Sequence, residues 1–199
     1  MSRKVLSDLV AGIEPSPTEE TSFLANSLKR QGVDVISFAQ GEPDFDTPDY
    51  IKNAAIEAVQ EGFTKYTDVP GILELREAVV QKLKRQNNLD YDVSEVLIGN
   101  GGKQLLYEVF ATLCDPGDEV VIPTPCYVSY VDQIRLTGAN AVFMPTQEEN
   151  KFRPRLEEVQ KIWNPKVKVF VLNSPCNPTG AVFEEEEMRK IMDFLVEKE

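Results

Sequence analysis

Histidine is missing from the sequence, and cysteine and tryptophan are scarce. The 199 residues contain no His, three Cys and one Trp. Without imidazole, the Ser-His and Cys-His pairs of nucleophilic enzymes and histidine metal ligands are excluded. The cysteines, at Cys114, Cys126 and Cys176, share no CxxC spacing, which argues against a disulfide framework or a structural zinc site. Any acid–base chemistry therefore has to use lysine, tyrosine or a carboxylate.

Positive charge and long apolar runs are also in short supply. Lys and Arg total 21 against 33 Asp and Glu, a net charge of −12, so we expect no nucleic-acid partner. No apolar run is long enough to span a bilayer, and the first residues, MSRKVLSDLV, carry an acidic residue too early for a secretory signal. We therefore expect a cytoplasmic protein without membrane contact. Its hydrophobic content of 42% is sufficient for a substantial core.

Helical and extended patterns alternate along the chain from Thr47 onward, where Thr47 is the expected N-cap of a helix. We predict helices at 48–62, 71–86, 105–113, 127–136, 155–163 and 184–195, and strands at 95–100, 119–123, 141–145 and 167–173. Apolar strands separated by helices favour an α/β fold with a largely parallel sheet covered on both faces. Residues 1–46 contain a turn-rich connector and one amphipathic helix, so we assign them to a separate substructure.

Three polar or glycine-rich clusters each follow a predicted strand directly. They are residues 99–104, 123–127 and 173–180. Ligands bind at the carboxyl ends of parallel strands. We therefore expect the three clusters to gather at one edge of the sheet and to share one ligand.

The first cluster contains Asn100-Gly101-Gly102-Lys103 at a strand-to-helix turn. Free backbone amides, the positive helix end and one ammonium group there form a seat for phosphate. Neither the Walker pattern nor GxGxxG is satisfied, because position 97 is Leu and position 104 is Gln, and this weakens a nucleotide-binding interpretation. A glycine-rich turn that only caps a helix remains the alternative.

The third cluster, NSPCNPTG at 173–180, follows the apolar run VKVFVL. Its prolines stiffen the turn and its glycine permits close approach, so the amide of Asn177 can be held in one orientation that suits a phenolate oxygen. An Asx-Pro turn explains any single pair but not the whole octet. In the second cluster, Tyr127 could cover a flat ligand ring, although a core role is the alternative. We interpret Cys126 and Cys176 as small fillers and assign them no chemistry.

Two acidic stretches are weak candidates for a cation site. Residues 184–187 are interpreted as the solvated first turn of a helix, where carboxylates complement the macrodipole. Glu42, Asp44 and Asp46 lie in a connector that lacks the calcium-hand loop pattern. We therefore expect no metal.

Five segments carry a family resemblance: SFAQGEPDFDTP, TKYTDVPGILELREAV, GNGGKQ, DPGDEVVIPTPCYVSY and VLNSPCNPTGAVF. Together, in this order, they resemble the pyridoxal-phosphate aminotransferases of fold type I, and most of all the aspartate aminotransferase branch. The resemblance covers essentially the whole chain. It implies a three-layer αβα large domain, here residues 47–199 without its C-terminal part, preceded by a segment of the small domain, residues 1–46. It also implies a homodimer that binds pyridoxal 5′-phosphate, an amino acid and a 2-oxo acid.

The resemblance assigns roles to individual residues. The amides of Gly101, Gly102 and Lys103 would hold the cofactor phosphate. Tyr127 would stack on the pyridine ring and Asn177 would hydrogen-bond its 3′ oxygen, and both would border the substrate.

Two more residues receive roles from the resemblance, and two depart from it. Tyr66 matches a tyrosine that reaches the cofactor phosphate of the neighbouring subunit, and Gly41 matches the position whose backbone meets the substrate α-carboxylate. Cys176 stands where close members usually have Asn or His. Cys126-Tyr127 replaces a larger aromatic pair that typically has Trp at the stacking position.

The family's Schiff-base lysine, its pyridinium-pairing Asp and its substrate-binding Arg are expected beyond Glu199. We therefore expect no catalytic residue within this chain, and the 199 residues alone to be inactive. The intact enzyme would transfer an amino group between an L-amino acid and a 2-oxo acid. Lys103, with Ser16 and Thr18, suggests substrates of the aspartate or glutamate class. Two alternatives remain: an inactive N-terminal fragment that at most binds phosphate or dimerises, and a lyase or synthase on the same scaffold.

Overall fold

The computed structural model describes residues 5–13 and 15–198, which fall into two compact units. One unit contains residues 5–13 and 101–198, and the other contains residues 15–100. The boundary that the sequence places after residue 46 stays a prediction. Within these described residues, no helix combines the length and the apolar character needed to cross a membrane.

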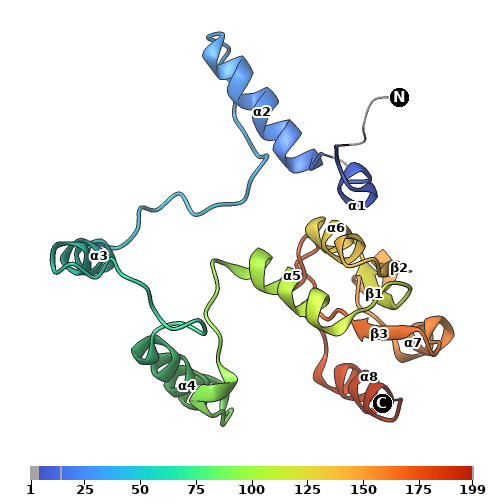
Figure 1. The fold of residues 1–199 in the computed structure, drawn as a ribbon. Coiled ribbons are helices and arrows are strands. Elements are labelled where there is room, and N and C mark those ends of the chain that lie inside the picture. Colours follow the sequence, from blue (N-terminus) through green and yellow to red (C-terminus); the bar gives the residue numbers. More distant parts are fainter. Residues whose placement is uncertain (1–4, 14, 199) are drawn as a thin grey trace. The chain divides into compact units, whose positions relative to one another are not determined.

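The unit of residues 15–100 consists of helices joined by extended connectors (Figure 1). The helices are α2 (Pro17–Arg30), α3 (Asp49–Gln60), α4 (Leu73–Asn87) and the short 3-10 helix η1 (Val93–Glu95). Pro48 rather than Thr47 is the N-cap of α3. The Thr47 amide donates instead to the carboxylate of Asp46 at 2.8 Å, and the Pro48 carbonyl accepts from the amides of Ile51 and Lys52.

The strand predicted at 95–100 does not form, which corrects the expectation from its apolar run. The structure has η1 in this region, held by a capping box between Asp92 and Glu95. The amide of Ile98 donates to the carbonyl of Pro70 at 2.9 Å, in the loop before α4. Its main-chain hydrogen bond therefore goes to a neighbouring loop and not to a strand ladder.

The other unit is built on a parallel sheet of three strands in the order β2-β1-β3. The strands are β1 (Glu119–Thr124), β2 (Asn140–Pro145) and β3 (Val167–Phe170). The helices are α1 (Asp8–Ala11), α5 (Gly102–Leu113), α6 (Ser129–Leu136), η2 (Glu148–Asn150), α7 (Leu156–Ile162) and α8 (Glu185–Val196). In the central register, Val121 of β1 lies between Val142 of β2 and Phe170 of β3. The third strand is shorter than predicted, although the Val171 amide still donates to the Val121 carbonyl at 2.9 Å.

Successive side chains of β1 point to opposite faces of the sheet and enter two different cores. Figure 1 shows α6 and α8 on opposite sides of the strands. Val120 and Ile122 are fully buried with residues of α5 and α6, and Val121 is fully buried with residues of α7 and α8. Each of these side chains contributes about 1.5–3 kcal/mol through burial. The helices thus cover both faces of the sheet, and the predicted three-layer αβα architecture is confirmed.

Candidate functional site

The carboxyl ends of β1 and β3 are the point where the chain leaves the sheet in two directions. The loop after β1 leads into α6, which packs on one face, and the loop after β3 leads to α8, which packs on the opposite face. In parallel α/β sheets, the crevice between neighbouring strands that diverge in this way is the usual ligand site. Two of the three predicted clusters, 123–127 and 173–180, leave the sheet at this crevice.

The loops that follow β1 and β3 touch each other. The thiol sulfur of Cys176 lies 3.7 Å from the main-chain carbonyl oxygen of Pro125. Both loops line one small cavity, which includes Cys126, Tyr130 and Asn177. The clusters 123–127 and 173–180, which lie far apart in the sequence, are therefore neighbours in the fold. The sequence predicted this for all three clusters, and these two contacts support it for two of them.

The loop at 173–180 is closed by its own hydrogen bonds. The Asn177 amide donates to the side-chain oxygen of Asn173 at 3.0 Å, and the amides of Gly180 and Cys176 bond the carbonyls of Cys176 and Ala181 at 2.7 and 2.9 Å. The peptide bonds that precede Pro125, Pro175 and Pro178 are cis. With the backbone of the loop satisfied internally, the side-chain amide of Asn177 lies exposed and can meet a ligand.

Tyr127 is half-buried where the β1 loop turns into α6. Its ring meets that of Tyr130 at a centroid distance of 5.5 Å and an interplanar angle of 86°. This edge contact occupies at most one face of the Tyr127 ring. Tyr130 is buried, and burial raises the pKa of its phenol, so it remains neutral and holds the Tyr127 ring beside the crevice.

The first predicted cluster, residues 99–104, leads into the N-terminus of α5. Gly101 is the N-cap with a φ of 89°, a conformation that favours glycine, and Gly102 is the first helical residue. An added Cβ at either glycine would meet no atom within 4 Å, so the backbone here is open to an approaching group. The amides of Gly102 and Lys103 have no acceptor within the helix. This helix end therefore presents amide donors to open space, and the Lys103 side chain is exposed beside them.

A hydrogen bond that the sequence did not predict joins this helix end to the rest of the site. The side-chain amide of Gln133 in α6 donates to the main-chain carbonyl of Lys103 at 2.6 Å. Gln133 lies six positions after Tyr127, and α5 packs against α6. The structure thus places the first turn of α5, with Gly102 and Lys103, against α6, the helix that follows the Tyr127 loop. The available sequence signal was a polar residue between Tyr130 and Ile134 on an otherwise apolar helix face.

Gly41 and Tyr66 belong to the unit of residues 15–100, whereas Gly101, Gly102, Lys103, Tyr127 and Asn177 belong to the other unit. Both are exposed, and Tyr66 has a relative exposure of 107%. Their expected roles, toward the substrate carboxylate and the partner's cofactor, stay predictions.

The residues at the sheet edge suit a flat ligand that carries a phosphate group. Backbone amides at a helix N-terminus and one ammonium favour an anion. An aromatic ring offers a stacking surface, and a side-chain amide held on a closed loop can donate to a phenolate oxygen. This donor set fits pyridoxal 5′-phosphate, the cofactor that the resemblance implies.

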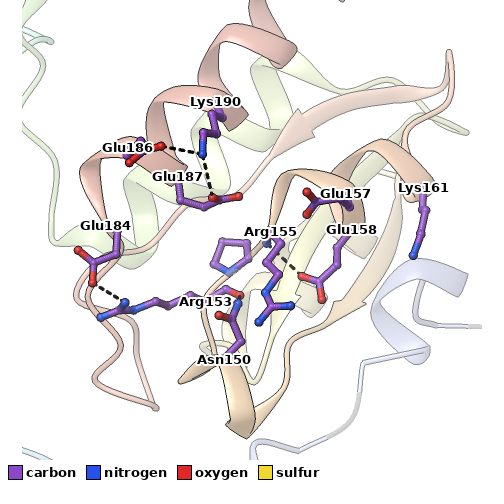
Figure 2. A pocket seen from close by; sticks show the side chains of 11 residues that line it. Asn150, Arg153, Arg155, Glu157, Glu158, Lys161, Glu184, Glu186, Glu187 and Lys190 are labelled. Carbon is purple, nitrogen blue, oxygen red and sulfur yellow. Dashed lines mark hydrogen bonds and ion pairs between the residues drawn. The ribbon is translucent and has the colours of Figure 1, made fainter.

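A second, charged hollow of about 650 Å³ lies on the surface between η2, α7 and α8 (Figure 2). Four cations and five carboxylates line it, and several of them pair with one another. Figure 2 shows Arg153 pointing at Glu184, and Lys190 between Glu186 and Glu187 at 2.9 and 3.8 Å. The Lys190 pairs lie within α8, and the Arg153–Glu184 pair joins the segment before α7 to the start of α8, so these charges partly neutralise one another.

The acidic connector before α3 does not form a metal site. Asp46 bonds the ammonium of Lys52 at 2.7 Å and the amide of Thr47 at 2.8 Å. The bond from Lys52, and then that from Thr47, lower the pKa of the Asp46 carboxyl, so its partners in the structure are an ammonium group and a main-chain amide. Residues 5–13 and 15–198 contain no cluster of three or more His, Cys, Asp or Glu side chains that could hold a metal ion.

Comparison with known proteins finds relatives over nearly the whole chain. Residues 33–199 match the family described as aminotransferase class I and II. The chain is 47% identical over 196 residues to a probable aspartate/prephenate aminotransferase of Aquifex aeolicus, with 98% of this chain and 50% of that protein covered. It is 43% identical over 198 residues to the aspartate/prephenate aminotransferase of Nitrosomonas europaea, at 96% and 50% coverage.

Solved structures give the same result. The aspartate aminotransferase from Thermus thermophilus with maleate superposes with a TM-score of 0.96 at 41% identity, covering 99% of this chain and 52% of that one. An alanine aminotransferase from Pyrococcus furiosus superposes with a TM-score of 0.91 at 30% identity, covering 97% and 50%. The chain thus spans about half the length of the relatives that it matches.

Proposed function

This chain belongs to the aminotransferase class I and II family, and from this premise we propose that it supplies the pyridoxal 5′-phosphate contacts of an aminotransferase. The reaction would move an amino group between an L-amino acid and a 2-oxo acid. One observation carries the proposal: the Tyr127 loop and the Asn177 loop touch where β1 and β3 end. The bond from Gln133 of α6 to the first turn of α5 supports including that helix end. Since the chain covers about half of its relatives, the activity of the whole protein is part of this proposal.

Each proposed cofactor residue has a separate task. The amides of Gly101, Gly102 and Lys103 bind the phosphate, because they end a helix and face open space. Tyr127 stacks on the ring. Asn177 donates its side-chain amide to the 3′ oxygen, held in place by the internal bonds of its loop. When bound, the cofactor supplies the electron sink for chemistry at the α-carbon of the amino acid.

Homodimer formation is a further part of the proposal. Tyr66 would reach the phosphate of the neighbouring subunit, and Gly41 would meet the substrate α-carboxylate. The unit of residues 15–100 supports this, because large apolar side chains such as Phe38, Phe45 and Tyr66 are more than four-fifths exposed there and call for a covering surface. A cytoplasmic location belongs to the same proposal.

We propose dicarboxylic substrates, with aspartate or glutamate as amino donor. Lys103 is exposed at the edge of the site, where its ammonium can pair with a distal carboxylate. Ser16 and Thr18 are the proposed additional contacts. The names of the relatives support this choice, because aspartate, prephenate and maleate each carry two carboxylates.

The test is an assay of the full-length protein with pyridoxal 5′-phosphate, aspartate and 2-oxoglutarate. We expect stoichiometric cofactor binding, followed visibly in the absorption spectrum, and formation of oxaloacetate and glutamate in equal amounts. Release of ammonia or carbon dioxide without amino transfer would indicate a lyase on the same scaffold. Failure to bind the cofactor would sink the proposal as a whole.

An assay of the 199-residue chain alone tests the alternative of an inactive N-terminal fragment. We expect it to show no transaminase activity, because the lysine that anchors the cofactor is expected outside it. Turnover by this chain alone would contradict that expectation.

A further inference from the structure

Two cysteines directly precede the two side chains that border the candidate site. Cys126 is followed by Tyr127, and Cys176 is followed by Asn177. One cysteine lies in the loop after β1 and the other in the loop after β3. Any change in the distance between these thiols therefore moves both sides of the crevice.

The geometry brings the two thiols together. Both line the same small cavity, between Ile122, Tyr130 and Phe183. The Cys176 sulfur is 3.7 Å from the Pro125 carbonyl oxygen, and covalent geometry then places the Cα of Cys126 within roughly 6.5 Å of that sulfur. Disulfides join residues whose Cα atoms lie about 4.4–6.8 Å apart. The bound above runs from one Cα to the partner sulfur, so formation of a bridge requires the two loops to move toward each other.

The two thiols also interact electrostatically. After burial, the nearby Cys176 is the second cause that raises the pKa of the Cys126 thiol. Both cysteines are reduced and half-buried, so a small oxidant can reach them. Cys114, in contrast, is buried and caps the far end of α5, before β1 begins. Since α5 starts at the site and runs for 12 residues, Cys114 lies about 18 Å from that edge.

We propose that Cys126 and Cys176 form a reversible disulfide that bridges the loops after β1 and β3. The oxidant is a low-molecular-weight disulfide such as glutathione disulfide. The thiolate of one cysteine attacks it, which forms a mixed disulfide and releases one glutathione thiolate. The second cysteine thiolate then displaces the remaining glutathione. One sulfur–sulfur bond breaks in the oxidant, one forms in the protein, and two protein thiols yield two glutathione thiols.

The bridge narrows the crevice between β1 and β3. A disulfide holds its sulfurs about 2.05 Å apart, closer than two thiols in van der Waals contact, so the loops are drawn together. Tyr127 and Asn177 move with their neighbouring cysteines. This consequence rests on the proposed function: if these residues hold pyridoxal 5′-phosphate, the oxidised protein binds it at least ten-fold more weakly than the reduced protein.

The experiment oxidises the full-length protein with glutathione disulfide and maps its cysteines by mass spectrometry without reduction. Asp-N is the suitable protease, because it cleaves before Asp115 and Asp118 and so separates Cys114 from Cys126. We expect a linked pair of peptides, two hydrogens lighter than their sum, that contain Cys126 and Cys176. Dithiothreitol should restore both free thiols.

Three variants make the mapping decisive. C114A should form the same bridge as the wild type, whereas C126S and C176S should each stop at one glutathione adduct. A bridge that includes Cys114, glutathione adducts without a bridge in the wild type, or absence of any reaction at Cys126 and Cys176 would overturn the proposal.

Cofactor titration of the reduced and the bridged protein tests the consequence separately. A loss of affinity of ten-fold or more on bridging, reversed by dithiothreitol and absent in C126S, supports control of the site. If the bridge is mapped but the reduced and the bridged protein bind the cofactor with equal affinity, the disulfide does not regulate the site. No binding in either form, with the bridge present, counts against the proposed function and leaves the disulfide established.

Discussion

The side-chain amide of Gln133 reaches the carbonyl of Lys103 at 2.6 Å and so joins the middle of α6 to the first turn of α5. Gln133 is 6% exposed, and its own side-chain oxygen has no hydrogen-bond partner in the structure. The bond thus fixes the position of a helix end while leaving one buried acceptor unsatisfied. Different replacements of Gln133 should therefore lower the free energy of unfolding by very different amounts.

Gln133→Met and Gln133→Glu form a matched pair that tests this bond. Methionine keeps the shape and removes both the donor and the unsatisfied oxygen, so we expect a change in unfolding free energy of no more than about 1 kcal/mol. Glutamate buries a carboxylate against the Lys103 carbonyl and should cost about 3 kcal/mol or more at neutral pH. Urea unfolding of the full-length protein measures both. Equal costs would show that the polarity of this side chain is unimportant.

Asn177→Ala tests the proposed contact to the cofactor ring. The Asn177 side chain is exposed and its loop is held by the main-chain amide, so we expect the melting temperature to stay within 2 °C. Loss of a hydrogen bond to a charged oxygen should weaken binding of pyridoxal 5′-phosphate by about ten- to a hundred-fold. Asn173→Ala is the comparison, since it removes the acceptor of the Asn177 amide and should lower cofactor affinity and stability together. The proposed bond from Asn177 to the cofactor ring is wrong if Asn177→Ala leaves the affinity for pyridoxal 5′-phosphate unchanged.

Lys103→Ala tests the preference for dicarboxylic substrates. We expect kcat/KM for aspartate and glutamate to fall at least ten-fold more than for aromatic amino donors, because only the acidic donors lose an ion pair. The control is Lys161→Ala, which removes an exposed lysine from α7 and should leave both substrate classes unaffected. An equal loss for acidic and aromatic donors would reject the assignment.

The half-buried thiol of Cys126 predicts a loss of stability at alkaline pH. Burial, and then Cys176, raise the pKa of this thiol above its unfolded value of about 8.5. Its stabilising contribution is therefore complete below that pH and is lost as the pH rises through the folded pKa. Under reducing conditions, the unfolding free energy of the wild type should decline above about pH 8.5 more steeply than that of Cys126→Ser. Parallel curves would contradict the pKa shift.

Gly71 and Gly62 provide a matched test of backbone strain in the unit of residues 15–100. Both have positive φ, 100° and 82°, but only at Gly71 would an added Cβ collide, at 2.7 Å from the side chain of Ile98. Gly62→Ala should lower the free energy of unfolding by about 1–2 kcal/mol because of its backbone conformation alone. Gly71→Ala should cost roughly 1–3 kcal/mol more because of the collision. Denaturant titration of both variants checks the difference, and equal effects would mean that Ile98 moves aside freely.

The sequence was sufficient for the architecture wherever one local pattern determined it. The run EVVIP is apolar on both faces and predicts the doubly covered β1, whose Val120 and Val121 enter separate cores. Strand-to-helix alternation then fixes a parallel sheet, and a parallel sheet fixes the edge at which Tyr127 and Asn177 emerge. These inferences succeeded because each step follows from burial or chain direction alone.

Features that depend on a distant partner were not accessible in this way. The apolar run at 95–100 has the composition of a strand, but it pairs with no strand among residues 5–13 and 15–198, and the Ile98 amide donates to the Pro70 carbonyl instead. Gln133 bonds a carbonyl 30 positions away, which no periodic pattern reveals. The pairing of Cys126 with Cys176 likewise requires two loops to be placed side by side before either thiol has any significance.

The double covering of β1 has a consequence for synthesis on the ribosome. Val121 shares its core with Ile191 of α8, which is made about 70 residues later. At a translation speed of about 5–20 residues per second, the strand waits some 4–14 s before its second face can be covered. During that interval the apolar face of β1 that carries Val121 is exposed on the nascent chain and can aggregate. A chaperone that covers this face should raise the yield of correctly folded protein.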